Sequence, residues 1–120
     1  MTSVAERYFA EDLRVGTDRL RREIGYNPTY FNRMVAEYGP VEACRRLIRA
    51  DAVSDGFTKL WEHNRLDMTV EALSLLPWYN EVFDDDVRDH ARRKLTAHRF
   101  DVDAFLANRT ASPPRWTISP

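Results

Sequence analysis

Five carboxylates between residues 81 and 89 are the first group in this sequence whose spacing could support chemistry. They are Glu81, Asp84, Asp85, Asp86 and Asp89. A calcium loop of the EF-hand type needs ligands at alternating positions, a central glycine and a closing glutamate. The three consecutive aspartates do not alternate, and no glycine follows them. We therefore predict that they cap a helix and face its positive end, and we expect no metal site.

Side chains that could act as nucleophiles or zinc ligands are few and far apart. The histidines are His63, His90 and His98, and no two of them have the i,i+4 spacing of a helical zinc site. Cys44 falls on the apolar face of a predicted helix, where a thiol usually serves as a small buried hydrophobe. Phosphate-binding loops and serine elbow motifs are absent. We therefore expect no enzyme activity and no cofactor.

Arginine carries almost all the basic charge, and its planar fork suits phosphates as well as carboxylates. Two groups of arginines on predicted helices could form a nucleic-acid-binding face. They are Arg45, Arg46 and Arg49 in one helix, and Arg92, Arg93 and Arg99 in or after another. The chain has 18 basic and 19 acidic residues and a net charge of -1, whereas phosphate binding usually leaves a clear basic surplus. Nucleic-acid binding is therefore our alternative hypothesis, and a solvated face is the simpler interpretation.

The last residues combine prolines with an aromatic side chain. Trp116 has no helical pattern around it, so its indole either folds back onto the domain or docks on a partner chain. Trp116, with its neighbours Arg115 and Ile118, is our candidate partner-binding group. Both alternatives for the indole stay open at this point.

The elements that must position these residues are helices. The 120 residues suit one domain, 43% are hydrophobic and 31% charged, and apolar residues recur every three or four positions. Ser3 and Glu6 form a capping box for a helix over about 4–24, which Gly25 ends. Asn27 and Pro28 are typical of the N-cap and first position of the next helix. We predict an all-α, single compact domain of six to seven mostly short helices over 1–109, followed by an irregular Pro-rich tail over 110–120.

Further signals place the later helices. Gly39 and Pro40 predict a corner between two helices, and Ser54, Thr69 and Asp101 are candidate N-caps. An aromatic set is predicted to lie mostly in the core. Its members are Phe57, Trp61, Trp78, Tyr79 and Phe83.

The segments "GFTKLWE" from Gly56 and "RLDMTVEAL" from Arg65 resemble a recurrent, uncharacterised bacterial all-helical module. That module has the pattern GFT-x-LWE followed by RLD-x-(T/S)-VEAL, and the similarity extends over roughly residues 25–100. The resemblance implies an accessory helical domain, sometimes attached to proteins that handle nucleic acids, and it transfers no catalytic residues. From the residues themselves, Thr69 or Asp67 caps a helix, Glu71 faces its positive end and Arg65 pairs with a carboxylate.

These observations favour a binding protein over a catalyst. No apolar run approaches the length of a membrane helix, and the first residues lack the basic start and apolar stretch of a secretory signal. We expect a cytoplasmic, non-catalytic module that binds a protein partner, with a homo-oligomer as one form of that association.

Overall fold

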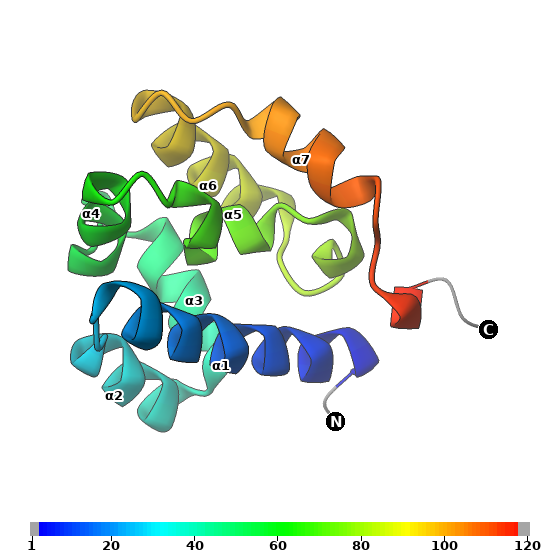
Figure 1. Ribbon diagram of the computed structural model, residues 1–120. Coiled ribbons are helices and arrows are strands. Elements are labelled where there is room, and N and C mark those ends of the chain that lie inside the picture. Colours follow the sequence, from blue (N-terminus) through cyan, green and yellow to red (C-terminus); the bar gives the residue numbers. More distant parts are fainter. Residues whose placement is uncertain (1–2, 118–120) are drawn as a thin grey trace.

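The computed structural model describes residues 3–117, and within this range the fold is all-α, as predicted (Figure 1). It contains seven α-helices and three 3₁₀ turns, and no β-strand occurs among the described residues. The helices are α1 (Val4–Ile24), α2 (Thr29–Tyr38), α3 (Pro40–Arg49), α4 (Asp55–Glu62), α5 (Val70–Ser74), α6 (Asp85–Ala97) and α7 (Val102–Thr110). The turns are η1 (Leu66–Met68), η2 (Pro77–Tyr79) and η3 (Arg115–Thr117).

The two ends of α1 follow the sequence signals. Ser3 Oγ accepts a hydrogen bond from the Glu6 amide at 3.1 Å, which satisfies one of the unpaired donors of the first turn. Gly25 has a φ of 67° and ends the helix in the left-handed conformation. The predicted range of 4–24 is therefore confirmed.

The start of α2 differs from the prediction by one residue. Pro28 occupies the N-cap position, and no side chain caps the helix, so the prediction that Asn27 is the cap was wrong. The Pro28 carbonyl accepts the first helical hydrogen bond, from the Asn32 amide at 2.9 Å. The helix therefore begins with Thr29.

The elements form two parts joined by α3 (Figure 1). One part contains α1 and α2, and the other contains α4 to α7; α3 packs against α1, α2, α5 and α6. Gly39 sets the angle between α2 and α3 with a φ of 83°, a value that suits glycine, and Pro40 begins α3 directly afterwards. The predicted corner is thus confirmed.

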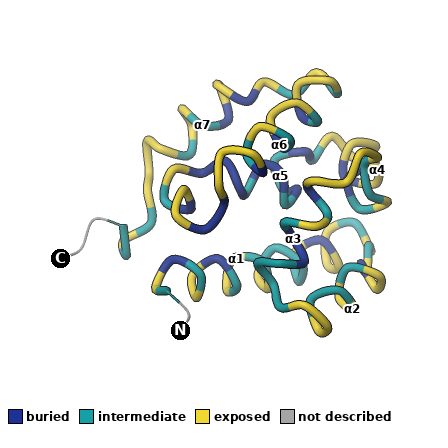
Figure 2. The backbone as a smooth tube through the Cα atoms, turned by 180° about the vertical axis from the view of Figure 1, so that it is seen from behind, coloured by how far each residue is buried: buried dark blue, intermediate teal, exposed yellow. Residues whose placement is uncertain are grey.

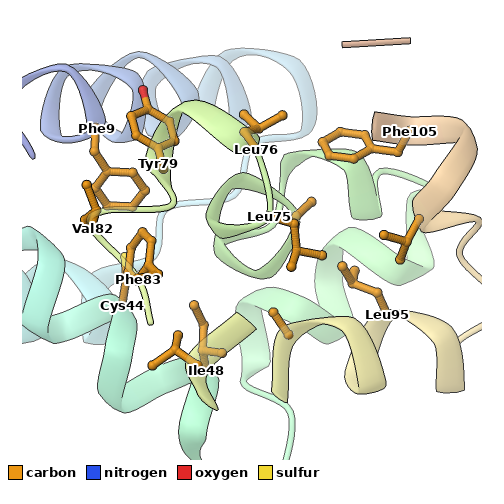
Figure 3. Packing of buried hydrophobic residues seen from close by; sticks show 14 of the residues in the cluster. Phe9, Cys44, Ile48, Leu75, Leu76, Tyr79, Val82, Phe83, Leu95 and Phe105 are labelled. Carbon is orange, nitrogen blue, oxygen red and sulfur yellow. The ribbon is translucent and has the colours of Figure 1, made fainter. Parts of the chain in front are cut away.

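The core extends from α1 and α3 through α5 and η2 to α6 and α7 (Figure 3). Phe9 packs edge-to-face against Tyr79 and Phe83, with ring centroids 5.2 Å and 4.9 Å apart. Cys44 and Ile48 point into the same cluster and have no exposed surface, as predicted. Figure 2 shows that buried residues recur from α5 to the loop before α6, with exposed residues between them.

One member of the predicted aromatic core lies outside it. Phe57, Tyr79 and Phe83 are buried and Trp78 is half-buried, but 51% of Trp61 is exposed. Trp61 contacts His98 at a centroid distance of 5.7 Å on the surface of α4. The prediction that Trp61 belongs to the core was wrong, because Phe57 and Leu60 supply the buried face of this short helix.

Candidate functional site

A cleft of about 780 Å³ separates α1 and the start of α2 from α4, η1 and α5. We call it the α1–α5 cleft. Six of its apolar wall residues are Leu13, Val15 and Leu20 from α1, and Phe57, Met68 and Leu73 from the opposite side. Val15 is 42% exposed and Tyr30, at the α2 end, is 64% exposed, so the cleft is open to solvent.

The cleft exists because α1 is anchored elsewhere. The N-terminal half of α1 packs on η2 through Phe9, and α1 also contacts α3. Facing the cleft, α1 carries Gly16, and a Cβ built there would have no neighbour within 4 Å. The wall at this point is therefore bare backbone with open space beside it.

Charged side chains line the cleft unevenly. Its carboxylates are Asp12, Asp55, Asp67 and Glu71, whereas its guanidinium groups are Arg19 and Arg109. Both arginines already face carboxylates, since Arg19 lies 3.3 Å from Glu23 and Arg109 lies 4.0 Å from Asp67. Two of the four carboxylates are paired as well, Asp67 with Arg65 at 3.2 Å and Glu71 with Lys94 at 3.8 Å, so the charges of the lining largely compensate one another.

Glu71 is the most unusual of these carboxylates because only 1% of it is exposed. Burial raises the pKa of Glu71 to about 6, and the Lys94 ammonium, 3.8 Å from Oε2, opposes part of that rise. Lys94 Nζ also donates a hydrogen bond to the Leu47 carbonyl at 3.1 Å, which ties α6 to α3. Burial raises the pKa of the nearby Cys44 thiol, and the Glu71 charge adds to this effect.

Two buried polar atoms beside the cleft lack partners. Glu71 Oε2 accepts no hydrogen bond and Trp78 Nε1 donates none within the described part of the chain, and both residues line the cleft. A buried polar group without a partner costs about 1–3 kcal/mol relative to a satisfied one. One of these atoms needs a donor and the other needs an acceptor.

The burial of Glu71 was not predicted from the sequence. The prediction that Thr69 caps α5 is confirmed, since Thr69 Oγ1 accepts from the Ala72 amide at 3.1 Å. Glu71 lies in the first turn of α5, at its positive end, as predicted. Leu75, four residues later, shares the face of Glu71 and is buried, so this spacing was the signal that could have predicted the burial.

The C-terminal aromatic residue folds back onto the domain. Trp116 stacks on Tyr8 with ring centroids 4.6 Å apart and planes at 2°, and it lies 6.0 Å from Tyr79. This decides between the two alternatives for the indole. Arg115 is exposed, and Ile118 lies outside the described residues, so a role in partner binding for these two stays a prediction.

The arginines of α3 are engaged with carboxylates and with the protein itself. Arg45 donates to the Val82 carbonyl at 2.8 Å, and Arg46 bonds Glu42 at 3.1 Å. Arg49 reaches across to Asp86 of α6 at 3.2 Å. Each of these three guanidinium groups therefore contacts a carboxylate or a carbonyl of the same chain, although the side chains remain 39%, 51% and 59% exposed.

Arginines on α6 also contact carboxylates and carbonyls of the same chain. Arg92 pairs with Asp103 of α7 at 3.2 Å, and Arg93 donates to the Asp89 carbonyl at 3.4 Å. Arg99 takes a φ of 63° in the turn that ends α6. The contact between Arg49 and Asp86 brings α3 beside α6, but carboxylates are interspersed among the arginines throughout.

The acidic cluster has the capping role that the sequence predicts. Asp84 Oδ1 accepts from the Val87 amide at 3.0 Å at the start of α6, and Asp85 lies 3.4 Å from Arg88. Among residues 3–117, no group of three or more histidine, cysteine or acidic side chains is arranged to hold a metal ion.

No helix of the described range is both long and apolar enough to cross a bilayer. No family model matches the chain, and neither a curated protein nor a solved structure is significantly similar to it. The resemblance to the GFT-x-LWE module therefore remains a prediction, and the cleft must be interpreted from its own chemistry.

Proposed function

We propose that this chain is a non-catalytic protein-binding module and that the α1–α5 cleft receives an apolar segment of its partner. The observation that supports this most directly is the open cleft of about 780 Å³ with apolar walls from α1, α4 and α5. Its volume lies within the range of about 300–1,000 Å³ of small-molecule pockets, so the open mouth and helical borders of the cleft are what support the protein-binding role.

The shape of the walls suits a segment of protein. Helices border the cleft on both sides, and grooves between helices commonly take the apolar face of another helix. Val15 and Tyr30 expose apolar surface at its mouth, which a partner would cover. The same surface would accept a second copy of this chain if the module self-associates.

A binding role also agrees with the state of the cysteine. Cys44 is fully buried, and the pKa of its thiol is raised by burial, so the reactive thiolate is disfavoured. Its surroundings are those of a packed core residue (Figure 3).

Site-specific photo-cross-linking in the native cells tests the proposal. A p-benzoylphenylalanine placed at Val15 lies in the cleft wall, whereas the same residue at Thr96 lies on the exposed surface of α6 and is the control. We expect one discrete protein adduct from position 15 and none of that size from position 96. Equal adducts from both positions, or none from position 15, would contradict the proposal.

Light scattering after size-exclusion chromatography identifies self-association. If the partner is a second copy, the adduct from position 15 has twice the mass of the chain, and the purified protein elutes as a dimer. If the chain is a monomer, the adduct identifies a different protein by mass spectrometry.

A further inference from the structure

The segment after α7 crosses from one side of the α1–α5 cleft to the other. Residues 111–117, which we call the strap, run from the end of α7 to the N-terminal half of α1 (Figure 1). Ser112 and Pro114 of the strap line the cleft together with Asp12 of α1. The strap therefore borders the cleft at the end where Asp12 lies, whereas the α2 end is open to solvent.

The contacts that hold the strap against α1 are aromatic. Trp116 stacks on Tyr8 of α1 and lies near Tyr79 of η2, and Tyr8 is still 42% exposed with the indole on it. The hydrogen bonds of residues 113–117 are internal, since the Thr117 amide and hydroxyl both donate to the Pro114 carbonyl, at 3.1 Å and 2.6 Å. Within the described part of the chain, no hydrogen bond joins residues 113–117 to another element. The strap is therefore held by a shallow contact that can open without breaking a polar bond.

The two prolines of the strap make it a stiff arm that is separate from α7. The Ser112 amide still donates to the Arg109 carbonyl, at 3.2 Å. Pro113 and Pro114 have no amide donor and have a fixed φ, so they cannot extend the bonding of the helix. Consecutive prolines favour extended backbone, which acts as a semi-rigid spacer. The arm can therefore pivot where α7 ends and carry Trp116 with it.

The first helix keeps its place without the strap. Phe9 packs edge-to-face against Tyr79 and Phe83, and Asp12 accepts a hydrogen bond from the Tyr79 hydroxyl. Tyr79 has no exposed surface while Trp116 is docked, so undocking would uncover part of its ring. Because Tyr79 is bonded to Asp12, which lines the cleft, the uncovered surface would continue the wall of the cleft.

We propose that the strap is a latch on the cleft. With Trp116 docked on Tyr8, the strap closes the end of the cleft at Asp12, and a ligand gains the full length of the cleft only when Trp116 leaves. The inference rests on the function proposed above for the nature of that ligand, a segment of a partner protein. Minor states of such two-state equilibria have populations of about 0.1–10%. The affinity for a ligand of the open state is reduced by the same fraction, so the latch is autoinhibitory.

Binding of the fluorescent apolar dye 8-anilinonaphthalene-1-sulfonate to the purified full chain tests the latch without the partner. Trp116→Ala releases the strap and should raise the affinity for the dye about tenfold or more. Arg115→Ala changes an exposed neighbour in the same strap and should leave the affinity at the wild-type value. Trp116→Phe keeps a ring that can stack on Tyr8, so its affinity should stay within about threefold of the wild type. Equal affinities of the wild type and Trp116→Ala would overturn the inference.

Two further comparisons locate the effect. Tyr8→Ala removes the other ring of the stack, so it should raise the affinity as Trp116→Ala does, and the double variant should show no further gain. Gly16→Leu fills the cleft and should cancel the gain of Trp116→Ala, whereas Ala36→Leu on the exposed side of α2 should not. Gains that multiply in the double variant, or a gain that survives Gly16→Leu, would overturn the inference. Circular dichroism checks that each variant is folded.

The outcomes separate the latch from the proposed function. If the affinity for the dye rises as expected but position 15 cross-links no partner, the strap closes the cleft and the protein-binding function is wrong. If position 15 cross-links a partner but Trp116→Ala changes neither the affinity for the dye nor the yield of the adduct, the cleft binds protein. The strap is then only a structural contact, which overturns the inference.

Discussion

The Tyr79 hydroxyl donates a hydrogen bond to the Asp12 carboxylate and so fixes α1 to η2. Tyr79 has no exposed surface, and its ring also contacts Phe9 and lies near Trp116. Asp12 lines one end of the α1–α5 cleft. This hydrogen bond therefore fixes α1, which forms one wall of the cleft, to the core.

Replacing this hydroxyl should destabilise the fold. In Tyr79→Phe the Asp12 carboxylate loses its donor, and a hydrogen bond to a charged group contributes about 2 kcal/mol. Urea unfolding should show that decrease in the free energy of unfolding. A double-mutant cycle with Asp12→Ala, which removes the acceptor, should give a coupling energy of at least about 1 kcal/mol, and additive effects would contradict the assignment.

Trp116 should contribute to stability although it lies near the end of the chain. Trp116→Ala removes a stacked ring from Tyr8 and apolar surface from Tyr79, so we expect a loss of about 2 kcal/mol in the free energy of unfolding. Trp61→Ala, which removes a tryptophan that is 51% exposed, should cost less than about 1 kcal/mol. The reverse order of these two losses would show that the C-terminal segment is not docked in solution.

The buried carboxylate of Glu71 should make stability depend on pH. The pKa of Glu71 rises from an ordinary value of 4.5 to about 6 on folding, chiefly through burial, so the folded chain holds this proton more tightly. The stability that this adds is complete below pH 4.5 and is lost as the pH rises through 6. It amounts to about 2 kcal/mol.

The measurement is the free energy of unfolding of the wild type minus that of Glu71→Gln. This difference should fall by about 2 kcal/mol between about pH 4 and about pH 7, and subtracting Glu71→Gln cancels the other carboxylates. The same comparison with Glu62→Gln should be flat across the range. A difference that rises with pH would mean that Lys94 stabilises the charged form more than burial disfavours it.

Replacement by alanine should change the free energy of unfolding in opposite directions at Gly16 and Gly39. Gly16 lies within α1 with open space around it, so Gly16→Ala should raise the free energy of unfolding by about 0.5–1 kcal/mol. Gly39 has a φ of 83° at the corner between α2 and α3, so Gly39→Ala should lower it by about 1–2 kcal/mol. Thermal unfolding of the two variants measures both shifts, and a stabilising effect at Gly39 would contradict the geometry of the corner.

The alternative hypothesis of nucleic-acid binding makes a separate prediction. The paired state of Arg49 and Arg92 leads us to expect no retardation of mixed duplex or single-stranded DNA or RNA in a mobility assay at low salt. A retarded band that weakens steeply with salt, and that disappears when Arg92→Glu and Arg93→Glu are combined, would instead support an arginine-rich nucleic-acid interface.

The helices could be predicted from the sequence because their signals are local. Ser3 and Thr69 act as caps through side-chain atoms three residues from their amide partners, and Gly25 ends α1 through its own backbone freedom. Such contacts depend on a few neighbouring residues. The start of α2 was missed by one residue because the Pro28 carbonyl begins the helix without any side-chain cap.

The site could not be predicted in the same way because it depends on contacts between distant residues. Glu71 is buried because α5 packs on α6, where Lys94 lies 23 positions later in the chain and offsets part of the charge. Trp116 stacks on Tyr8 although more than one hundred residues separate the two in the sequence. The spacing of Glu71 and Leu75 indicates a shared face but not the pairing with Lys94. The sequence likewise left two interpretations of the arginines open, because it does not show which carboxylates Arg49 and Arg92 contact.

The most direct test of the binding role is the affinity of the partner segment itself. The segment that cross-links to position 15 is synthesised and titrated against the wild type, Gly16→Leu and Ala36→Leu by calorimetry. The account predicts saturable one-to-one binding that is lost in Gly16→Leu and kept in Ala36→Leu, because only the former fills the α1–α5 cleft. Equal binding by all three proteins would contradict it.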